Sequence, residues 1–273
     1  MTSDGPEVPL GLRVACHDSV VVVTIDREEV LNALDSPLRV ALAALLRRLA
    51  MDATPRALVL TGAGQRAFTV GQDLREAEHL DAESGRAWMA TWLDLYEAIA
   101  SLPMPTVAAL NGVAAGAGFQ LGLLCDVRVA SSTARFGLRE VDVGLPAVTG
   151  FWLLASMLGR SRAIDLVLTG RMMEADEAFA HGLVHRVTEP SELEATSLAL
   201  ALRLASLPRL AMRATRDRMR EATLPALREA SQAAARYQVA AVETGVPQEL
   251  MSGFLARARQ RRMRDGEGDR AHG

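Results

Sequence analysis

Short apolar runs alternate with helically spaced apolar patterns through the first half of the chain. The runs are rich in β-branched residues and predict buried strands at 20–25, 58–61, 106–110 and 127–130. Leucine and alanine recur at helical spacing over 37–49, and Trp88 and Trp92 share one side of a predicted helix over 86–100. This order of strands and helices predicts an α/β fold with a mostly parallel sheet.

Helical patterns occupy almost all of the sequence after residue 146. Helices are predicted at 174–181, 190–206, 207–219 and 224–243. We therefore expect an α/β core followed by a helical tail. Residues 1–11 are rich in glycine and proline and residues 265–273 in glycine and charge, so both ends are expected to be flexible.

Composition narrows the classes of protein that this chain can belong to. Its 273 residues are 49% hydrophobic, enough for one sizeable domain. The net charge of −3 gives no general attraction for nucleic acid or an anionic membrane. No apolar run approaches ~20 residues, and the N-terminal residues form no apolar signal region, so spanning a membrane and secretion are disfavoured. We expect a cytoplasmic protein.

The residue types also limit the chemistry. The sequence contains no lysine, which excludes a lysine Schiff base. Cys16 and Cys125 are too few for a disulfide framework and are expected to be reduced thiols. The five histidines are scattered without metal-ligand spacing, so no metal site is expected.

Two glycine-containing stretches, 67–74 and 111–120, each lie between a predicted strand and a predicted helix. Such loops bring backbone N–H groups to a helix N-terminus, and two of them together can polarise one carbonyl oxygen. Taken singly, each is more simply an ordinary strand-to-helix turn. The glycines of the second stretch are spaced G-x-x-x-G-x-G, which does not match the dinucleotide-binding fingerprint.

Two polar residues are candidates for acid/base work. Glu140 lies in a short polar gap between apolar stretches, where burial would raise its pKa and let it carry protons. From spacing alone, Glu140 is more simply interpreted as an exposed loop carboxylate. Gln120 lies on the first turn of the helix after the second glycine-containing stretch, and its amide cannot act as a general base.

Five stretches, in order, resemble the crotonase superfamily of enoyl-CoA hydratases and isomerases. They are 22–34, 67–74, 111–120 with 124–126, 136–146, and 168–170 with 175–187. The resemblance spans about residues 12–262. It implies a crotonase-like α/β spiral core of repeated ββα units over 12–195, and a C-terminal α-helical trimerisation region over 196–264. It further implies homotrimers, or hexamers built as dimers of trimers.

The resemblance also implies a chemistry. Family members hold the enolate of an acyl-CoA thioester with two backbone N–H groups, which fall here on Gln72 and Ala117. Hydratases of the family use two glutamates; one is present as Glu140, and the other position holds Gln120. Hydration, isomerisation, decarboxylation and non-catalytic acyl-CoA binding all stay open. No cofactor is implied, because coenzyme A is part of the substrate.

The remaining expectations concern binding. By resemblance, the CoA and substrate groove involves Arg27, Ala67, Phe68, Val70, Gly71, Asp73, Leu74, Gly116, Phe254 and Arg257. Arg257 opens a run of arginines that is most simply a solvated helix face. The acyl pocket is expected near Trp88 and Trp92 and near Phe151 and Trp152, although all four are also candidates for the core or for subunit contacts.

Overall fold

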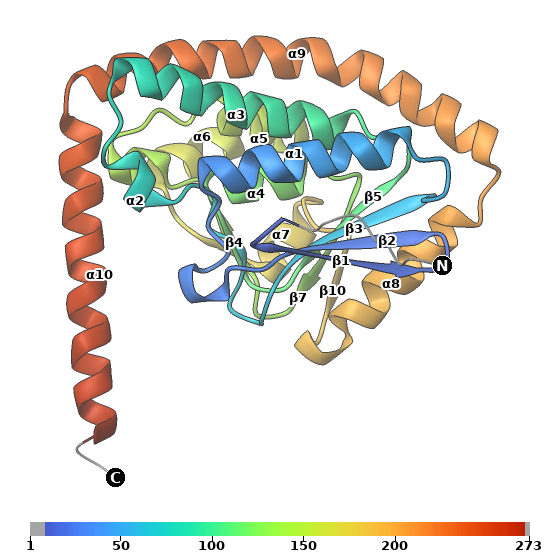
Figure 1. Ribbon diagram of the computed structural model, residues 1–273, viewed down its shortest axis with the longest axis horizontal. Coiled ribbons are helices and arrows are strands. Elements are labelled where there is room, and N and C mark those ends of the chain that lie inside the picture. Colours follow the sequence, from blue (N-terminus) through green and yellow to red (C-terminus); the bar gives the residue numbers. More distant parts are fainter. Residues whose placement is uncertain (1–8, 271–273) are drawn as a thin grey trace.

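A computed structural model describes the backbone of residues 9–270. Most of the expected leader and the side chains of Arg259, Arg261, Arg262 and Arg264 lie outside the described residues. A spiral of strand pairs and helices forms the body, and two long helices complete the chain (Figure 1).

The main sheet has six strands in the order β1-β2-β3-β5-β7-β10. They are β1 (Leu12–His17), β2 (Val20–Ile25), β3 (Ala57–Gly62), β5 (Thr106–Leu110), β7 (Val127–Ser131) and β10 (Arg186–Thr188). All neighbouring pairs are parallel except β1 and β2, which form a hairpin at Asp18, where φ is 53°. The predicted parallel sheet and its four strands are confirmed, whereas β1 was not predicted.

Both faces of this sheet are buried, which explains the continuous apolar runs. On β3, Leu58 and Leu60 belong to the large core cluster, while Val59 joins a smaller cluster under α8 (Leu193–Ala205). Buried residues of α1 (Ser36–Met51) and α3 (Ala82–Ala100) also belong to the large cluster. These two helices lie over the face of the sheet opposite to α8 (Figure 1).

A second sheet carries the loops of interest. Its short strands, in the order β4-β6-β8-β9, are β4 (Ala67–Thr69), β6 (Val113–Ala115), β8 (Arg135–Gly137) and β9 (Met173–Glu174). The strands β4, β6 and β8 directly follow β3, β5 and β7, so two-strand units repeat along the chain. Strands of two or three residues give too weak a periodic signal for prediction, so this sheet was not foreseen.

The other helices are largely short and connect these strands. They are α2 (Leu74–Ala77), α4 (Ala117–Leu123), α5 (Val148–Leu158), α6 (Arg160–Thr169) and α7 (Ala175–Ala180), with 3₁₀ turns η1 (Glu28–Val30), η2 (Glu140–Val143) and η3 (Pro190–Glu192). The expectation of helix almost throughout after residue 146 was therefore too broad, because β9 and β10 interrupt it.

The C-terminal region consists of α9 (Arg209–Glu243) and α10 (Val246–Arg270). The predicted break between 219 and 224 is wrong, since α9 runs through Pro225. An interior proline costs about 3 kcal/mol. The buried residues Leu227, Ala230 and Ala234, which lie past the proline, hold the helix against the body. The helix α10 leaves the body and extends away from it (Figure 1) and continues past residue 264, into the segment expected to be flexible.

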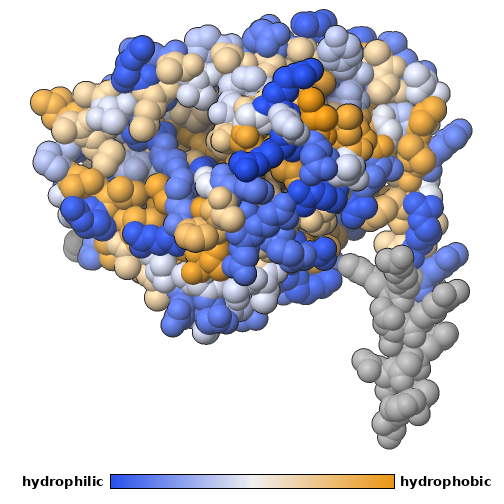
Figure 2. Space-filling view, turned by 180° about the vertical axis from the view of Figure 1, so that it is seen from behind, coloured by the Kyte–Doolittle hydropathy of each residue, from blue (hydrophilic) through white to orange (hydrophobic). Residues whose placement is uncertain are grey.

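Hydrophobic side chains on the far face form several patches separated by hydrophilic ones (Figure 2). Within residues 9–270, no helix has the length and apolarity needed to cross a bilayer.

Candidate active site

A cavity of about 370 Å³ lies where α3, the loops before α2 and α4, and η2 meet. Its lining includes Trp88, Met89, Trp92 and Tyr96 from α3, Gln72 from the loop before α2, Ala117 and Gln120 from α4, and Glu140 from η2. Phe254 of α10 and Gln238 of α9 also line it. The C-terminal helices thus complete a cavity that the spiral core begins.

The two glycine-containing loops approach each other closely at this cavity. Gly71 has φ +82°, and a methyl group there would lie 3.0 Å from the backbone nitrogen of Ala117. Any side chain on Gly71 would therefore push the loops apart. Gln72 follows Gly71, and Ala117 begins α4 directly after Gly116, whose φ is 52°. The proposed N–H donors, Gln72 and Ala117, therefore sit on adjoining backbone segments that both line the cavity.

The backbone conformation suits this arrangement. Ala117 is not among the described residues with positive φ, so its side chain fits this backbone conformation without strain. Within residues 9–270, the backbone N–H groups of Gln72 and Ala117 have no hydrogen-bond acceptor. Two backbone donors thus remain available on one cavity wall.

Glu140 is the buried carboxylate of the site. It begins η2, its side chain is only 7% exposed, and a methyl group on Gly116 would lie 3.6 Å from its Oε1. Burial raises its pKa to about 7, although a hydrogen bond from Gln120 partly opposes that effect. The interpretation of Glu140 as an exposed loop acid is wrong, because the turn packs inward against α4.

The two oxygens of Glu140 differ. Oε1 accepts a 2.7 Å hydrogen bond from Nε2 of Gln120. Oε2 is buried and has no hydrogen-bond partner among the described residues. The carboxylate therefore has one oxygen fixed by the protein and one that is free to take up a proton.

Tyr96 is the residue that sequence reasoning missed. Its hydroxyl donates to Oε1 of Gln120 at 3.2 Å, with the carbonyl oxygen of Ala117 at 3.4 Å. Burial and the charge of Glu140 raise the pKa of Tyr96 well above its ordinary value, so the phenol stays protonated. Its position four residues after Trp92, on the same helical face, was an available signal.

The rings of Trp88, Trp92 and Tyr96 form an aromatic wall along one side of the cavity. The Trp92 and Tyr96 rings lie 5.6 Å apart. Behind them, the fully buried guanidinium of Arg39 lies 4.7 Å from the Trp92 ring centroid and 5.5 Å from that of Trp88. The expectation that Phe151 and Trp152 shape this pocket is wrong, since both pack against the core instead.

The residues expected to bind CoA are divided between the cavity and the scaffold. Val70, Leu74, Gly116 and Phe254 line the cavity. Ala67 and Phe68 are buried in β4, and the Ala67 carbonyl accepts hydrogen bonds from Asn32 and Asn111. These two residues hold the first loop in place and do not line the cavity.

Two of the three charged residues of the expected groove have partners within the protein, and the third, Arg257, is exposed. Arg27 forms ion pairs with Asp35 at 3.1 Å and with Asp73 at 3.4 Å. Burial opposes ionisation of Asp73, but hydrogen bonds from Arg75 outweigh it and lower its pKa. Asp73 also caps α2, and Arg257 is exposed on α10.

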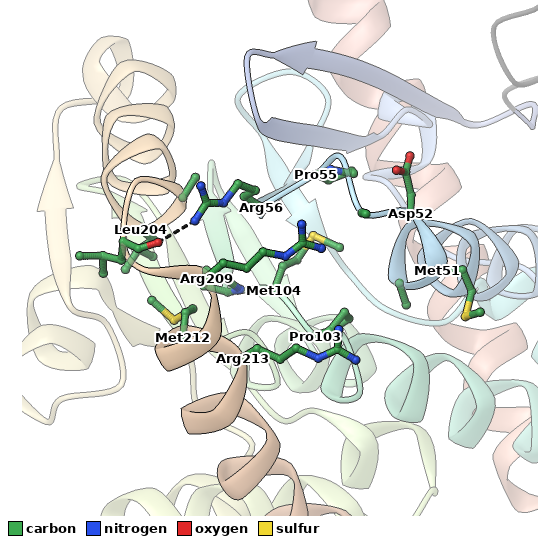
Figure 3. A pocket seen from close by; sticks show the side chains of 15 residues that line it. Met51, Asp52, Pro55, Arg56, Pro103, Met104, Leu204, Arg209, Met212 and Arg213 are labelled. Atoms are coloured by element: carbon green, nitrogen blue, oxygen red, sulfur yellow. Dashed lines mark hydrogen bonds between the residues drawn. The ribbon is translucent and has the colours of Figure 1, made fainter.

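A second, smaller pocket of about 130 Å³ lies elsewhere, beside the start of α9 (Figure 3). Arg56, Arg209 and Arg213 line it together with three methionines. Arg56 is held by the carbonyl oxygen of Leu207 at 2.6 Å. Its nearby carboxylate, Asp52, accepts a hydrogen bond from the backbone of Thr54, so this pocket lacks the buried acid found at Glu140.

No group of three histidine, cysteine or acidic side chains within the described part of the chain could hold a metal ion. Asp126, which follows α4, forms an ion pair with Arg216 of α9 and accepts a hydrogen bond from the backbone N–H of Thr106.

This spiral of two-strand units with long C-terminal helices is the crotonase fold. The family model described as enoyl-CoA hydratase/isomerase matches residues 15–261. The chain belongs to the enoyl-CoA hydratase/isomerase family, whose members here are named as hydratases and isomerases of acyl-CoA compounds.

Several relatives show how broad this similarity is. The chain is 37% identical to the short-chain-enoyl-CoA hydratase of Clostridium acetobutylicum, over 68% of this chain and 72% of that protein. It is 33% identical to the 1,2-epoxyphenylacetyl-CoA isomerase of Escherichia coli, over 87% of this chain and 92% of that protein. An enoyl-CoA hydratase/isomerase structure from Mycobacterium paratuberculosis superposes with a TM-score of 0.84 at 27% identity, covering 90% of this chain and 99% of that chain.

Proposed function

We propose that this enzyme binds an enoyl-CoA thioester and moves a proton between two carbons of its acyl chain, with Glu140 as the single acid/base. The observation that carries the proposal is the hydrogen bond from Gln120 to Glu140. The side-chain amide of Gln120 donates an N–H to the carboxylate of Glu140. An amide cannot accept a proton from water, so Gln120 cannot act as a second base. One carboxylate is sufficient for a 1,3-proton shift.

The backbone N–H groups of Gln72 and Ala117 hold the thioester oxygen in this proposal. Oε2 of Glu140 takes the proton from C2 of a 3-enoyl-CoA, and the electron pair of that C–H bond moves into the conjugated system, leaving the negative charge mainly on the thioester oxygen. The paired N–H groups stabilise this enolate. Glu140 then returns its proton to C4, and the double bond finishes between C2 and C3.

The environment of Glu140 supports this role. A pKa of about 7 lets the carboxyl group act as base and then as acid near neutral pH. The cavity around it is mainly apolar, with the aromatic wall on one side. An apolar acyl chain fits such a lining, and exclusion of water strengthens the interactions that hold the enolate.

Hydration of a 2-enoyl-CoA is the second candidate function. It is favoured by the names of relatives such as the Clostridium hydratase and a probable enoyl-CoA hydratase of Rhizobium meliloti, to which the chain is 38% identical over 71% of its length. In that reaction Glu140 alone would activate the water, without a second carboxylate at position 120.

Turnover of 2-enoyl-CoA and 3-enoyl-CoA thioesters, followed by mass spectrometry, separates these reactions. Isomerisation leaves the mass unchanged and is followed by the ultraviolet absorbance of the conjugated 2-enoyl thioester, hydration adds the mass of water, and loss of CO₂ from a carboxylated substrate would show decarboxylation instead. The Glu140→Gln variant is expected to lose ~10²–10⁴-fold in kcat while it keeps its acyl-CoA affinity. The exposed carboxylate Glu194 of α8 provides the control, since Glu194→Gln removes a negative charge outside the cavity. Equal activities of wild type and Glu140→Gln would contradict the proposal.

The proposal needs no cofactor, because coenzyme A enters as part of the substrate. We further propose that Arg257 contacts a phosphate of CoA, since guanidinium groups bind phosphate in a bidentate manner. Arg257→Gln is expected to raise KM for acyl-CoA and to leave kcat nearly unchanged. An unchanged KM would count against a phosphate contact at this position.

We also propose assembly into trimers or hexamers through the C-terminal helices. Exposed hydrophobic side chains lie along these helices at Leu210, Met219, Tyr237 and Val246, with exposed fractions of 83%, 55%, 61% and 49%. Such side chains are typical of subunit contacts. Light scattering at micromolar concentration tests this, and a monomer would contradict it.

A further inference from the structure

Tyr96, Gln120 and Glu140 form a continuous polar chain inside an otherwise apolar region. They come from three elements, α3, α4 and η2, and have exposed fractions of 4%, 6% and 7%. The phenol of Tyr96 donates to the amide oxygen of Gln120, and the amide nitrogen of Gln120 donates to Oε1 of Glu140. The three side chains therefore interact through the amide of Gln120.

The chemistry of the three groups fixes the direction of this chain. An ionised carboxylate can only accept, so Gln120 must present its nitrogen to Glu140 and its oxygen to Tyr96. The oxygen of a buried amide needs a donor, and the Tyr96 hydroxyl supplies it. Without that donor, the amide oxygen would be left without a partner in an apolar setting, and the amide would turn or shift.

We propose that Tyr96 is a positioning residue that acts through Gln120. By holding the amide in one orientation, Tyr96 keeps Oε1 of Glu140 occupied as an acceptor and leaves Oε2 as the oxygen that carries the proton. This inference rests on the proposed function, in which Glu140 is the acid/base. It assigns to position 120 a donor role, in place of the second glutamate that the family resemblance implies for hydratases.

Other charged groups around this chain are already paired. Arg39 of α1 lies behind the aromatic wall and binds Thr91, Leu34 and Glu76. Arg139 pairs with Asp142 beside Glu140 on the cavity lining at 2.7 Å, and Arg135 of β8 pairs with Glu174. None of these pairs includes Tyr96, so we expect an effect of Tyr96 on Glu140 to pass through Gln120.

The substitution Tyr96→Phe removes only the hydroxyl and keeps the ring in the aromatic wall. We expect kcat to fall about tenfold, as for the loss of one hydrogen bond at a catalytic group, with little change in KM. The hydrogen bond from Gln120 to ionised Glu140 becomes weaker, so the pKa of Glu140 rises. The acid limb of the kcat pH profile therefore moves to higher pH. A purely structural loss would lower activity without moving that limb.

The variant Gln120→Met gives a second, independent test. It removes the donor to Glu140 directly and should move the acid limb in the same direction, even if Tyr96→Phe does not fold. If Tyr96 acts through Gln120, adding Tyr96→Phe to Gln120→Met changes kcat by less than about twofold. Fully multiplied effects of the two substitutions would overturn the proposal.

Met89→Leu is the matched control, because Met89 lines the same cavity from the same helix and forms no hydrogen bond to Tyr96, Gln120 or Glu140. It is expected to change KM and to leave the acid limb in place. Glu140→Gln separates the two proposals. If it keeps full activity, the proposed function fails; if it is inactive while Tyr96→Phe shows the wild-type profile, only the role of Tyr96 fails.

Discussion

Gln120 donates a 2.7 Å hydrogen bond to Glu140, yet burial still holds the pKa of that carboxyl group at about 7. Loss of hydration therefore outweighs the one donor that the protein supplies. The carboxyl group is more stable protonated than ionised in the folded protein at mildly acidic pH. This relationship has a consequence for stability as well as for activity.

The free energy of unfolding is expected to fall as the pH rises. In the unfolded chain Glu140 loses its proton near its ordinary pKa of 4.5, whereas in the folded protein it keeps the proton to about pH 7. Between these values the folded state binds more protons than the unfolded state. The free energy of unfolding therefore falls by up to about 3 kcal/mol as the pH rises through this range. Glu140→Gln should remove this loss and be more stable than wild type at pH 8. Urea unfolding of wild type and Glu140→Gln at pH 5 and pH 8 measures these free energies. The same pH dependence in both proteins would contradict the prediction.

Gln120→Glu is expected to increase hydration of a 2-enoyl-CoA by at least ~10-fold, because a second carboxylate can accept the proton of water. Glu140 and the new carboxylate would share a proton at this short separation, and the Tyr96 hydroxyl would still donate to position 120. The control Gln238→Glu places a carboxylate elsewhere on the same lining. If both variants hydrate at the wild-type rate, position 120 does not determine the choice of reaction.

Gly71→Ala is expected to lower kcat/KM by ~10²–10³-fold, the effect of losing one donor to an oxyanion. The new methyl group would lie 2.8 Å from the nitrogen of Gly118 and 3.0 Å from that of Ala117, so the two loops must separate. Gly182→Ala is the matched control, since φ there is +74° and nothing lies within 4 Å of the added methyl. Both variants should lose about 1–2 kcal/mol of stability from the left-handed backbone, and equal kinetic effects would argue against a special role for Gly71.

Arg39→Met is expected to destabilise the fold by about 1–3 kcal/mol, the cost of leaving buried acceptors without their donor. The guanidinium is fully buried, donates to Leu34, Thr91 and Glu76, and lies against two tryptophan rings. The control Arg47→Met breaks an exposed pair with Asp94 from the same helix and should cost less than about 1 kcal/mol. Thermal unfolding of both variants tests this, and a loss for Arg39→Met no larger than the control's would contradict it.

Much of the fold followed from local pattern. The strands β2 and β5 begin and end where the apolar runs do, because a strand buried on both faces must be apolar along its whole length. The two glycine-containing loops were placed correctly between strand and helix, since glycine permits the backbone conformations that such a close approach needs. Glu140 was singled out by its polar position between apolar stretches.

The sequence by itself therefore determined the parallel sheet, the two loops with their N–H groups, and the presence of a carboxylate at 140 with an amide at 120. Only the tertiary structure decided that Gln120 donates to Glu140, that Tyr96 from a separate helix orients Gln120, and that α9 continues through Pro225. Those outcomes depend on burial and on contacts between segments far apart in the chain. Such contacts leave no periodic signal in the sequence, and burial, which sets the pKa of Glu140, exists only once the elements have packed together.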